Sequence, residues 1–254
     1  MEFRNDYQDS VRASSYAKLE FPGTYELAFR DLPEIVRRQA LGRRALDFGC
    51  GAGRSTRLLA SWGFESVGVD ISAEMLERAR SFDPHGDYRL AADDGRLPFA
   101  YGRFDLALSA FTFDNIPTWE KKISLFRELA RVLVPGGRLF NLVSTPDIYT
   151  HEWASFSTAD YPENKKARTG DPVLIVNTAI EDRRPVADIL WTDESYRDVY
   201  ARAELELLEM RKLLARPDEK AAWVNETRIA PWCVYVLRSL PGSRRLITQK
   251  THIE

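Results

Sequence analysis

The sequence predicts an α/β protein with a doubly wound sheet, because short apolar runs alternate with amphipathic runs of helical period. The clearest unit is ALDFGCGAGRST at residues 45–56, where an apolar run with one carboxylate leads into three glycines at alternate positions. A second apolar run, FDLALS at residues 104–109, has the composition of a strand that helices cover on both faces. With 254 residues, 44% of them hydrophobic, the chain can bury a full core as one domain.

Strands and helices are expected to alternate through the first half of the chain. A helix from Thr24 has apolar residues near a 3.6-residue period, and Pro33 should perturb it or begin a second piece. After the glycines we expect a helix over Ser55–Ser61, a strand over Glu65–Val69, a helix capped by Ser72, strands over Tyr88–Ala92 and Phe104–Ser109, a helix over Trp119–Val134 and a strand over Arg138–Val143. Pro135-Gly136-Gly137 is a typical stop signal for the last of these helices.

The rest of the chain is less regular. Residues 144–171 form a long loop segment rich in aromatic residues, and extended runs over Val173–Ile180 and Pro185–Trp191 predict a β-hairpin. A helix from Asp193 and strands over Leu205–Met210 and Pro231–Leu240 follow. The tail from Pro241 has a solvated composition.

The glycine-rich turn indicates a nucleotide-type ligand, because glycine turns with positive φ and lets a ligand approach the main chain. The helix after it would present free backbone N–H groups. A dinucleotide fingerprint, G-x-G-x-x-G, would need a third glycine where this chain has Arg54. Asp47, at the end of the strand, would repel a pyrophosphate and attract a cationic amine. S-adenosylmethionine carries such an amine, together with a positive sulfonium and no phosphate.

The stretch resembles the glycine-rich first motif of the class I S-adenosylmethionine-dependent methyltransferases, and later motifs extend the resemblance over roughly residues 41–143. Asp70 follows the second expected strand, Asp93 precedes Leu97-Pro98-Phe99, and Leu-x-Pro-Gly-Gly at residues 133–137 precedes the fifth strand. The resemblance implies a Rossmann-like seven-stranded sheet in the order 3-2-1-4-5-7-6 with the last strand antiparallel. An N-terminal helical lid and a C-terminal β-hairpin insertion would complete the fold.

The resemblance also implies one methyltransferase domain over residues 1–254. We divide it into an N-terminal lid (1–41), a cofactor-binding core (42–143), a substrate-side insertion (144–192) and the C-terminal completion of the sheet (193–240). The implied activity is methyl transfer from S-adenosylmethionine to an O or N atom of a small aromatic or heterocyclic molecule.

Cofactor contacts follow from the matching motif positions. In the family, an acid at the position of Asp70 holds both ribose hydroxyls, and an acid at that of Asp93 recognises the adenine, with Asp94 contributing a backbone N–H. The lid would add an aromatic contact, for which Tyr16 is the first candidate. The candidate cofactor contacts are Tyr16, Asp47, Gly49, Cys50, Gly51, Gly53, Asp70, Ile71, Asp93, Asp94 and Ser109.

The acceptor should lie beyond the carboxyl end of the fourth strand, at residues 109–115. This segment lacks the Asn/Asp-Pro-Pro-aromatic sequence of enzymes that methylate amide or exocyclic nitrogen, which disfavours DNA adenine or glutamine as the acceptor. Asp114 could accept a proton or orient an N–H donor, and its alternative role is to cap the next helix. His151 and Tyr16 are further catalytic candidates, and Tyr149 is an alternative base. The candidate substrate contacts are Tyr7, Phe111, Phe113, Asn115, Tyr149 and Trp153, with packing in the core as the alternative role of the aromatic residues.

Composition argues against several other classes of protein. The formal net charge of −2 and the lack of long basic runs give no support for a nucleic-acid partner. Two cysteines are too few for a disulfide framework or a zinc site, and no carboxylate cluster suggests a metal. No apolar stretch is long enough to span a bilayer. We therefore expect a cytoplasmic monomer or homodimer that binds a small-molecule acceptor, without metal, membrane or nucleic acid.

Two other functions stay open from the sequence alone. A pyridine-nucleotide oxidoreductase would bind NAD, and a silent S-adenosylmethionine-binding or regulatory protein would keep Asp47 and Asp70 but lack an acceptor pocket beyond Phe113. The sequence does not identify the acceptor or decide between oxygen and nitrogen.

Overall fold

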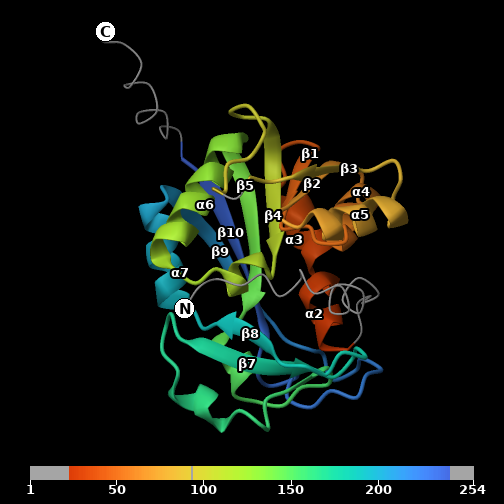
Figure 1. Ribbon diagram of the computed structural model, residues 1–254, viewed down its shortest axis with the longest axis vertical. Coiled ribbons are helices and arrows are strands. Elements are labelled where there is room, and N and C mark those ends of the chain that lie inside the picture. Colours follow the sequence, from red (N-terminus) through yellow and green to blue (C-terminus); the bar gives the residue numbers. More distant parts are fainter. Residues whose placement is uncertain (1–22, 93, 241–254) are drawn as a thin grey trace.

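A seven-stranded sheet forms the centre of the molecule in a computed structural model that describes residues 23–92 and 94–240 (Figure 1). Its strands are β1 (Arg44–Phe48), β2 (Glu65–Asp70), β3 (Asp87–Leu90), β4 (Phe104–Ala110), β5 (Leu133–Ser144), β9 (Leu205–Leu213) and β10 (Trp232–Ser239). They lie in the order β3-β2-β1-β4-β5-β10-β9. The pairs among the first five strands are parallel, whereas β10 is antiparallel to both of its neighbours. The predicted order and the reversed last strand are confirmed.

Helices cover both faces of the sheet, and each face has its own apolar core. Helices α3 (Leu32–Gln39) and α4 (Arg54–Ser61) pack on one face, and α6 (Trp119–Val132) and α7 (Asp193–Arg202) pack on the other. Alternate residues of β4 enter the two cores, Leu106 and Leu108 on the side of α3, and Ala107 on the side of α6. This double burial explains why the strand is apolar along most of its length.

The boundary between α6 and β5 differs from the prediction. The helix ends at Val132, and Leu133 is already extended, with φ −80° and ψ 145°. β5 begins there, pairs Leu133 with Phe104, and shifts its register between Phe104 and Leu106. The prediction that the helix continues to Val134 and that the strand starts at Arg138 is therefore wrong, because pairing with β4 extends the chain before the Pro-Gly-Gly segment.

β3 is shorter than predicted, and two predictions about helix starts are confirmed. β3 ends at Leu90 instead of Ala92, because its partner β2 ends opposite Leu90 at Asp70. Helix α5 (Ala73–Phe82) begins after Ser72, whose hydroxyl accepts a hydrogen bond from Met75 N, as predicted. The N-terminal helix divides at Asp31 into α2 (Thr24–Arg30) and α3, with Pro33 in the first turn of α3. Pro33 therefore begins a second piece.

A smaller lobe lies beyond the carboxyl ends of β4 and β5, at the bottom of Figure 1. We call it the lower lobe, and it comprises α2, residues 145–192 and the β9–β10 connection at residues 214–231. It contains the short helices η3 (Pro146–Tyr149) and η4 (Pro162–Lys166) and the strands β6 (Phe156–Ser157), β7 (Pro172–Asn177) and β8 (Val186–Ile189). β7 and β8 form the predicted antiparallel hairpin, and β6 pairs with the other side of β7.

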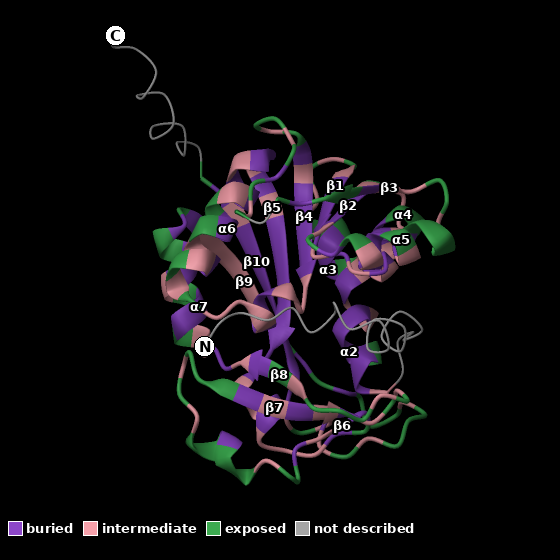
Figure 2. Cartoon of the chain, in the orientation of Figure 1, coloured by how far each residue is buried: buried purple, intermediate pink, exposed green. Residues whose placement is uncertain are grey.

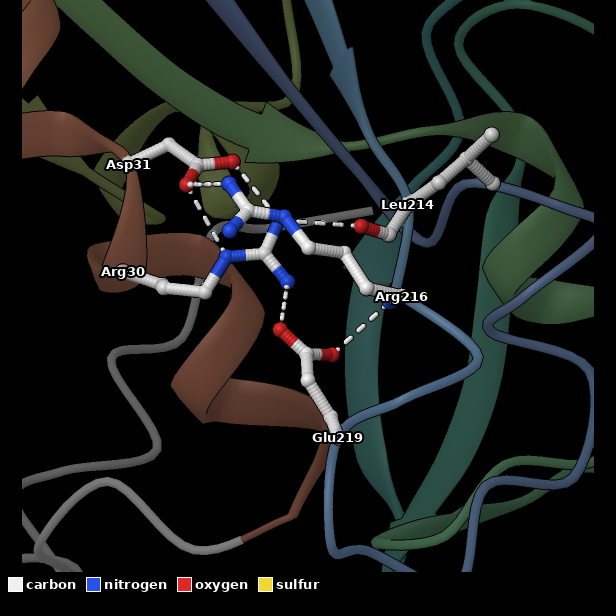
Figure 3. Close-up of polar contacts among 5 residues, drawn as sticks. All are labelled: Arg30, Asp31, Leu214, Arg216 and Glu219. Atoms are coloured by element: carbon white, nitrogen blue, oxygen red, sulfur yellow. Dashed lines mark hydrogen bonds and ion pairs between the residues drawn. The ribbon is translucent and has the colours of Figure 1, made fainter.

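Charged side chains tie α2 to the β9–β10 connection (Figure 3). Arg30 forms an ion pair with Asp31 at 2.7 Å and another with Glu219, and donates to Leu214 O at 3.0 Å. Glu219 also accepts from Arg216 N at 2.8 Å. Figure 2 shows that buried residues continue from the central strands into β7 and α2, so the lower lobe shares its packing with the sheet. Over the described ranges, no helix is long and apolar enough to cross a membrane.

Candidate functional site

The glycine turn after β1 has one closed side and one open side. Gly49 adopts φ 73°, and a Cβ there would lie 2.1 Å from Thr112 Oγ1, so no other residue fits. Gly51 adopts φ 52°, and the atom nearest to its would-be Cβ is Met75 Cε at 3.2 Å. The chain therefore turns sharply at Gly49, while a ligand has access to the main chain at Gly51.

Asp47 lies at the end of β1 beneath this turn and is fully buried. Its Oδ2 accepts hydrogen bonds from Ser55 Oγ and Thr56 Oγ1, both at 2.6 Å, while its Oδ1 has no partner within the described part of the chain. Burial raises the pKa of Asp47 to about 6, although the two hydroxyls oppose that rise. A buried carboxylate oxygen without a donor fits a ligand that brings a positive N–H group, such as the ammonium of S-adenosylmethionine.

Asp70 ends β2 and holds the glycine turn against α5. Its Oδ2 accepts from Gly51 N at 2.8 Å, and its Oδ1 accepts from Ser72 N at 2.9 Å. Burial raises the pKa of this carboxyl, and the backbone donors oppose the rise. Each carboxylate oxygen can accept a further bond, so the predicted ribose contact is compatible with this geometry and stays a prediction.

The other cofactor candidates lie in different environments. Gly53 adopts φ 79° and precedes α4, and Cys50 beside it is buried, with its N–H bonded to Val69 O. Ile71 is 47% exposed next to Asp70, and Asp94 is exposed, with its carboxylate bound by Arg96 N. Ser109 is buried in β4 beside Phe48, and its hydroxyl has no partner among the described residues. Tyr16 and Asp93 lie outside the described residues.

A cavity of about 50 Å³ lies between the ends of β4 and β5 and the lower lobe. Phe111, Asn115 and Tyr149, three of the predicted substrate contacts, line it together with Asp114. The remaining lining residues are Tyr25, Ser144, Ile148, Phe156, Ile175, Asn177, Ile180, Asp182, Arg184, Val186, Asp188 and Trp232. Phe111 has φ 63°, a conformation uncommon for a residue with a side chain, and this turn directs the chain from β4 into η2 (Thr112–Asn115).

Asp114 is held in the wall of this cavity, and it does not cap a helix. The N-cap of α6 is Thr118, whose side chain accepts from Lys121 N. Asp114 Oδ2 accepts from Ser144 N at 3.0 Å and Ser144 Oγ at 2.8 Å. Burial and the nearby carboxylate of Asp188 raise the pKa of Asp114, and the Ser144 donors and Lys122 oppose the rise. The group is thus buried, hydrogen-bonded and more basic than an ordinary aspartate.

Lys122 belongs to the same buried cluster, and sequence reasoning missed it. Its side chain is fully buried, and its Nζ donates to Phe113 O. The Nζ lies 4.5 Å from the ring centroid of Trp191 and 5.1 Å from that of Tyr196. Burial lowers the pKa of Lys122, and the carboxylates of Asp114 and Asp188 oppose that shift. Its position in the sequence could have indicated burial, because Lys122 comes three residues before Leu125 and four before Phe126, which are both buried in α6.

Asp188 is the second residue of this cluster that sequence reasoning missed. It lies in β8 of the lower lobe, is 9% exposed, and accepts a hydrogen bond from Tyr149 Oη at 3.1 Å. Burial, followed by the charges of Asp188 and Asp114, raises the pKa of Tyr149 well above its usual range, so this phenol stays protonated. No motif marks Asp188, because it reaches the cavity only through folding of the hairpin.

Three other candidates lie elsewhere. Phe113 is fully buried and stacks on Phe126, with the ring centroids 3.9 Å apart. Trp153 is buried, and its indole N–H donates to Ile148 O at 2.9 Å. His151 is half-buried, with Nδ1 3.0 Å from Asp147 O. These three are not among the described residues that line the cavity, and Tyr7 lies outside the described residues. The described residues contain no group of three or more His, Cys, Asp or Glu that could hold a metal ion.

Comparison with known proteins agrees with the fold and the glycine turn. Residues 46–141 match the family described as "Methyltransferase domain". N-demethylindolmycin N-methyltransferase of Streptomyces griseus is 26% identical over 199 residues, which cover 77% of this chain and 81% of that protein. Probable tRNA methyltransferase 9B of Bos taurus is 32% identical over 106 residues, which cover 42% of this chain and 22% of that protein. The chain thus spans about a fifth of the length of some curated relatives that it matches.

Among solved structures, the PH0226 protein from Pyrococcus horikoshii OT3 is similar, with a TM-score of 0.64 and 18% sequence identity. The similarity covers 93% of this chain and 99% of that protein, so it shows that the two share a fold. Three observations converge on one assignment: the strand order, the family match, and the glycine turn with the Asp47 oxygen beneath it that has no partner among the described residues. Residues 46–141 match a methyltransferase domain, and together with the fold this match supports a class I S-adenosylmethionine-dependent methyltransferase with S-adenosylmethionine as its cofactor.

Proposed function

We propose that the chain transfers the methyl group of S-adenosylmethionine to an O or N atom of a small aromatic or heterocyclic molecule. The observation that carries this proposal is the cavity at the carboxyl ends of β4 and β5, where ligands of open α/β sheets bind. Its wall combines the aromatic side chains of Tyr25, Phe111, Phe156 and Trp232 with the carboxylate of Asp114. Apolar walls with a few placed polar groups are typical of small-molecule sites.

Different residues of the chain would bind the cofactor, orient the acceptor and accept its proton. S-adenosylmethionine supplies a methyl group that its positive sulfur already activates. Asp47, Asp70 and the backbone at Gly51 would hold the cofactor, and the aromatic wall would orient the acceptor and exclude water. From the described residues, Asp114 Oδ1 accepts a single long hydrogen bond, at 3.3 Å from Ser144 N, so this oxygen can take the proton that the acceptor loses.

Other classes of acceptor and function have less support. The match to a probable tRNA methyltransferase covers 42% of the chain, whereas the match to a small-molecule N-methyltransferase covers 77%. Arg54 stands where a dinucleotide turn would have its third glycine, which disfavours NAD. A silent binding protein would need no cavity beside Asp114.

We further propose a cytoplasmic monomer or homodimer without a nucleic-acid partner, consistent with a net charge of −2 and two free cysteines.

Calorimetric titration and a turnover assay test this proposal. We expect S-adenosylmethionine and S-adenosylhomocysteine to bind and NAD not to bind. With an acceptor found by screening phenols, amines and heterocycles for S-adenosylhomocysteine release, Asp114→Asn should lower kcat at least about tenfold. Its dissociation constant for S-adenosylhomocysteine should stay within about twofold of the wild-type value, because Asp114 faces the acceptor cavity.

The matched control is Asp160→Asn, which changes an exposed carboxylate of the lower lobe. It should leave kcat and the dissociation constant for S-adenosylhomocysteine unchanged. Binding of NAD without any response to S-adenosylhomocysteine would refute the cofactor assignment. Cofactor binding without turnover of any screened acceptor would favour a regulatory protein.

A further inference from the structure

The buried face of β7 ends in an amide at the cavity wall. Alternate residues of this strand are buried, and these are Val173, Ile175 and Asn177. The first two are apolar, as expected for a strand face that packs on a core, whereas Asn177 is polar and only 2% exposed. Asn177 pairs with Phe156 of β6, and both residues line the cavity together with Ile175. A polar side chain therefore lies among apolar residues of the wall.

Hydrogen bonding fixes the orientation of this amide. The Oδ1 atom of Asn177 accepts from Ala179 N at 2.9 Å. A backbone N–H can only donate, so the atom that it meets is the amide oxygen, and the other atom is Nδ2 with its two N–H donors. The chain beyond β7 is held as well, because Thr178 N donates to Ser155 O at 2.8 Å.

The Nδ2 atom of Asn177 is buried and has no hydrogen-bond partner among the described residues. Buried donors are almost always paired, because burial removes the water that would otherwise accept from them. The turn after β7 does not account for this donor, since an aspartate or serine side chain can also accept from the N–H two residues later. The turn thus explains Oδ1 of Asn177 and leaves Nδ2 without a structural role.

A second buried asparagine of the lower lobe shows what a structural amide looks like. The Nδ2 atom of Asn164 donates to Tyr149 O at 2.9 Å and to Leu174 O at 2.8 Å, and its Oδ1 accepts from Leu174 N at 3.2 Å. Asn164 is not among the described residues that line the cavity. The amide whose donor has no partner in the described fold is therefore the one on the cavity wall.

We propose that Asn177 determines acceptor specificity by donating a hydrogen bond from Nδ2 to a carbonyl oxygen of the acceptor molecule. This inference rests on the proposed function and narrows the acceptor to an aromatic or heterocyclic molecule that carries a carbonyl group besides the O or N atom to be methylated. A carbonyl oxygen accepts from an amide N–H in the plane of its own substituents. A flat conjugated carbonyl compound can therefore meet Nδ2 with its edge while its faces contact Phe156 and Ile175.

Matched probes test the carbonyl preference without requiring turnover. The meta and para isomers of hydroxyacetophenone have nearly the same shape as the corresponding ethylphenols, and all four are predominantly neutral at pH 7. Only the ketones carry a carbonyl oxygen. We titrate each probe by calorimetry into the protein saturated with S-adenosylhomocysteine. In at least one of the two pairs the ketone should bind at least about fivefold more tightly than the ethylphenol, because it gives the buried donor an acceptor.

Variants show whether Asn177 causes this preference. Asn177→Asp keeps the size of the side chain and an acceptor for Ala179 N, but it replaces the donor by an oxygen. Asn177→Ser also keeps an acceptor for the turn and removes the amide nitrogen. In both variants the ratio of the two dissociation constants should fall to within about twofold of one. The control Thr178→Ser changes the next residue, which is not among those that line the cavity, and should keep the wild-type ratio.

The results separate this inference from the function on which it depends. Equal binding within both pairs, no binding of any probe at millimolar concentration, or a ketone preference that survives in both Asn177 variants would overturn the proposed contact. Methylation of a molecule without a carbonyl group, by a protein that shows no ketone preference, would refute this inference and leave the proposed methyltransferase activity intact. Failure to bind S-adenosylhomocysteine would refute the activity itself.

Discussion

Asp47 stabilises the fold with one carboxylate oxygen, and we propose that its other oxygen binds the cofactor. Oδ2 binds the first turn of α4 through Ser55 and Thr56, which fixes the helix behind the glycine turn. Oδ1 is buried without a donor among the described residues, so the ligand-free protein bears the cost of a poorly solvated charge. A cofactor ammonium would remove that cost, and this couples cofactor affinity to the protonation of Asp47.

The pH dependence of cofactor binding should therefore report on Asp47. In the ligand-free protein the pKa of this carboxyl is raised from 3.8 to about 6, so its contribution to stability is fully present below pH 3.8 and is lost as the pH rises through about 6. An ammonium pairs only with the ionised form. We expect S-adenosylhomocysteine to bind about tenfold more weakly at pH 5 than at pH 7, as measured by calorimetry.

Asp47→Asn is the variant that isolates this effect. It keeps the size of the side chain and an acceptor for Ser55 and Thr56, but it removes the titrating charge. Its affinity at pH 7 should be lower than that of the wild type and should vary little between pH 5 and 7. A wild-type affinity that is constant over this range would show that Asp47 does not meet the ammonium.

At the scale of elements, α2 is held to the rest of the lower lobe through one buried carboxylate. Glu226 is fully buried, and its Oε1 accepts from Thr24 Oγ1 at 2.8 Å and from Ala154 N at 2.7 Å. Its Oε2 accepts from Val224 N at 2.7 Å and from Asn225 N at 3.0 Å. One side chain thus joins the start of α2, the segment after β5 and the β9–β10 connection. Because Tyr25 follows Thr24, this junction also places an aromatic wall of the cavity.

Glu226→Gln should destabilise the protein markedly. The amide replaces one acceptor oxygen by a donor, so the two N–H or O–H groups that bond to that oxygen lose their partner, at roughly 1 to 3 kcal/mol each where they are buried. We expect the free energy of unfolding in urea to fall by about 2 kcal/mol or more. The matched control is Glu219→Gln, in the partly exposed ion pair with Arg30 (Figure 3), which should cost less than about 1 kcal/mol. Equal losses in the two variants would contradict this account of the junction.

At the scale of the whole molecule, the sheet and the lower lobe share one core. The apolar cluster on the α3 side of the sheet contains Leu108 and Phe140 of the sheet together with Trp153, Phe156 and Ile175 of the lower lobe. Trp232 at the start of β10 donates its indole N–H to Thr24 O at 2.7 Å, which joins the last strand to α2. The lower lobe therefore has little core of its own.

We expect the sheet and the lower lobe to unfold in a single transition. Tryptophan fluorescence, which includes Trp153 and Trp232, and far-ultraviolet circular dichroism should give the same midpoint in urea. Saturating S-adenosylhomocysteine should raise both midpoints together, because a ligand that binds only the folded state stabilises the whole cooperative unit. A fluorescence midpoint well below the dichroism midpoint would show that the lower lobe unfolds separately.

Local sequence patterns predicted the strand, glycine turn and helices at the proposed cofactor site. These elements form through interactions between residues within about ten positions of one another, so the local pattern predicts them directly. They include the apolar run before Asp47, the glycines after it and the helix cap at Ser72. The order of the sheet followed from the family that these motifs resemble. The end of α6 was misplaced, because pairing of Leu133 with β4 is a long-range contact that overrides a local stop signal.

The composition of the proposed acceptor cavity depends on tertiary contacts. Asp114, Lys122 and Asp188 come from η2, α6 and β8, and no local pattern shows that their charges meet. Phe111 and Phe113 lie two residues apart in the same turn. Phe113 stacks in the core, whereas Phe111 lines the cavity. The burial and the electrostatic environment of a side chain depend on which distant segments pack around it. Residues of one type can therefore differ in pKa and in role.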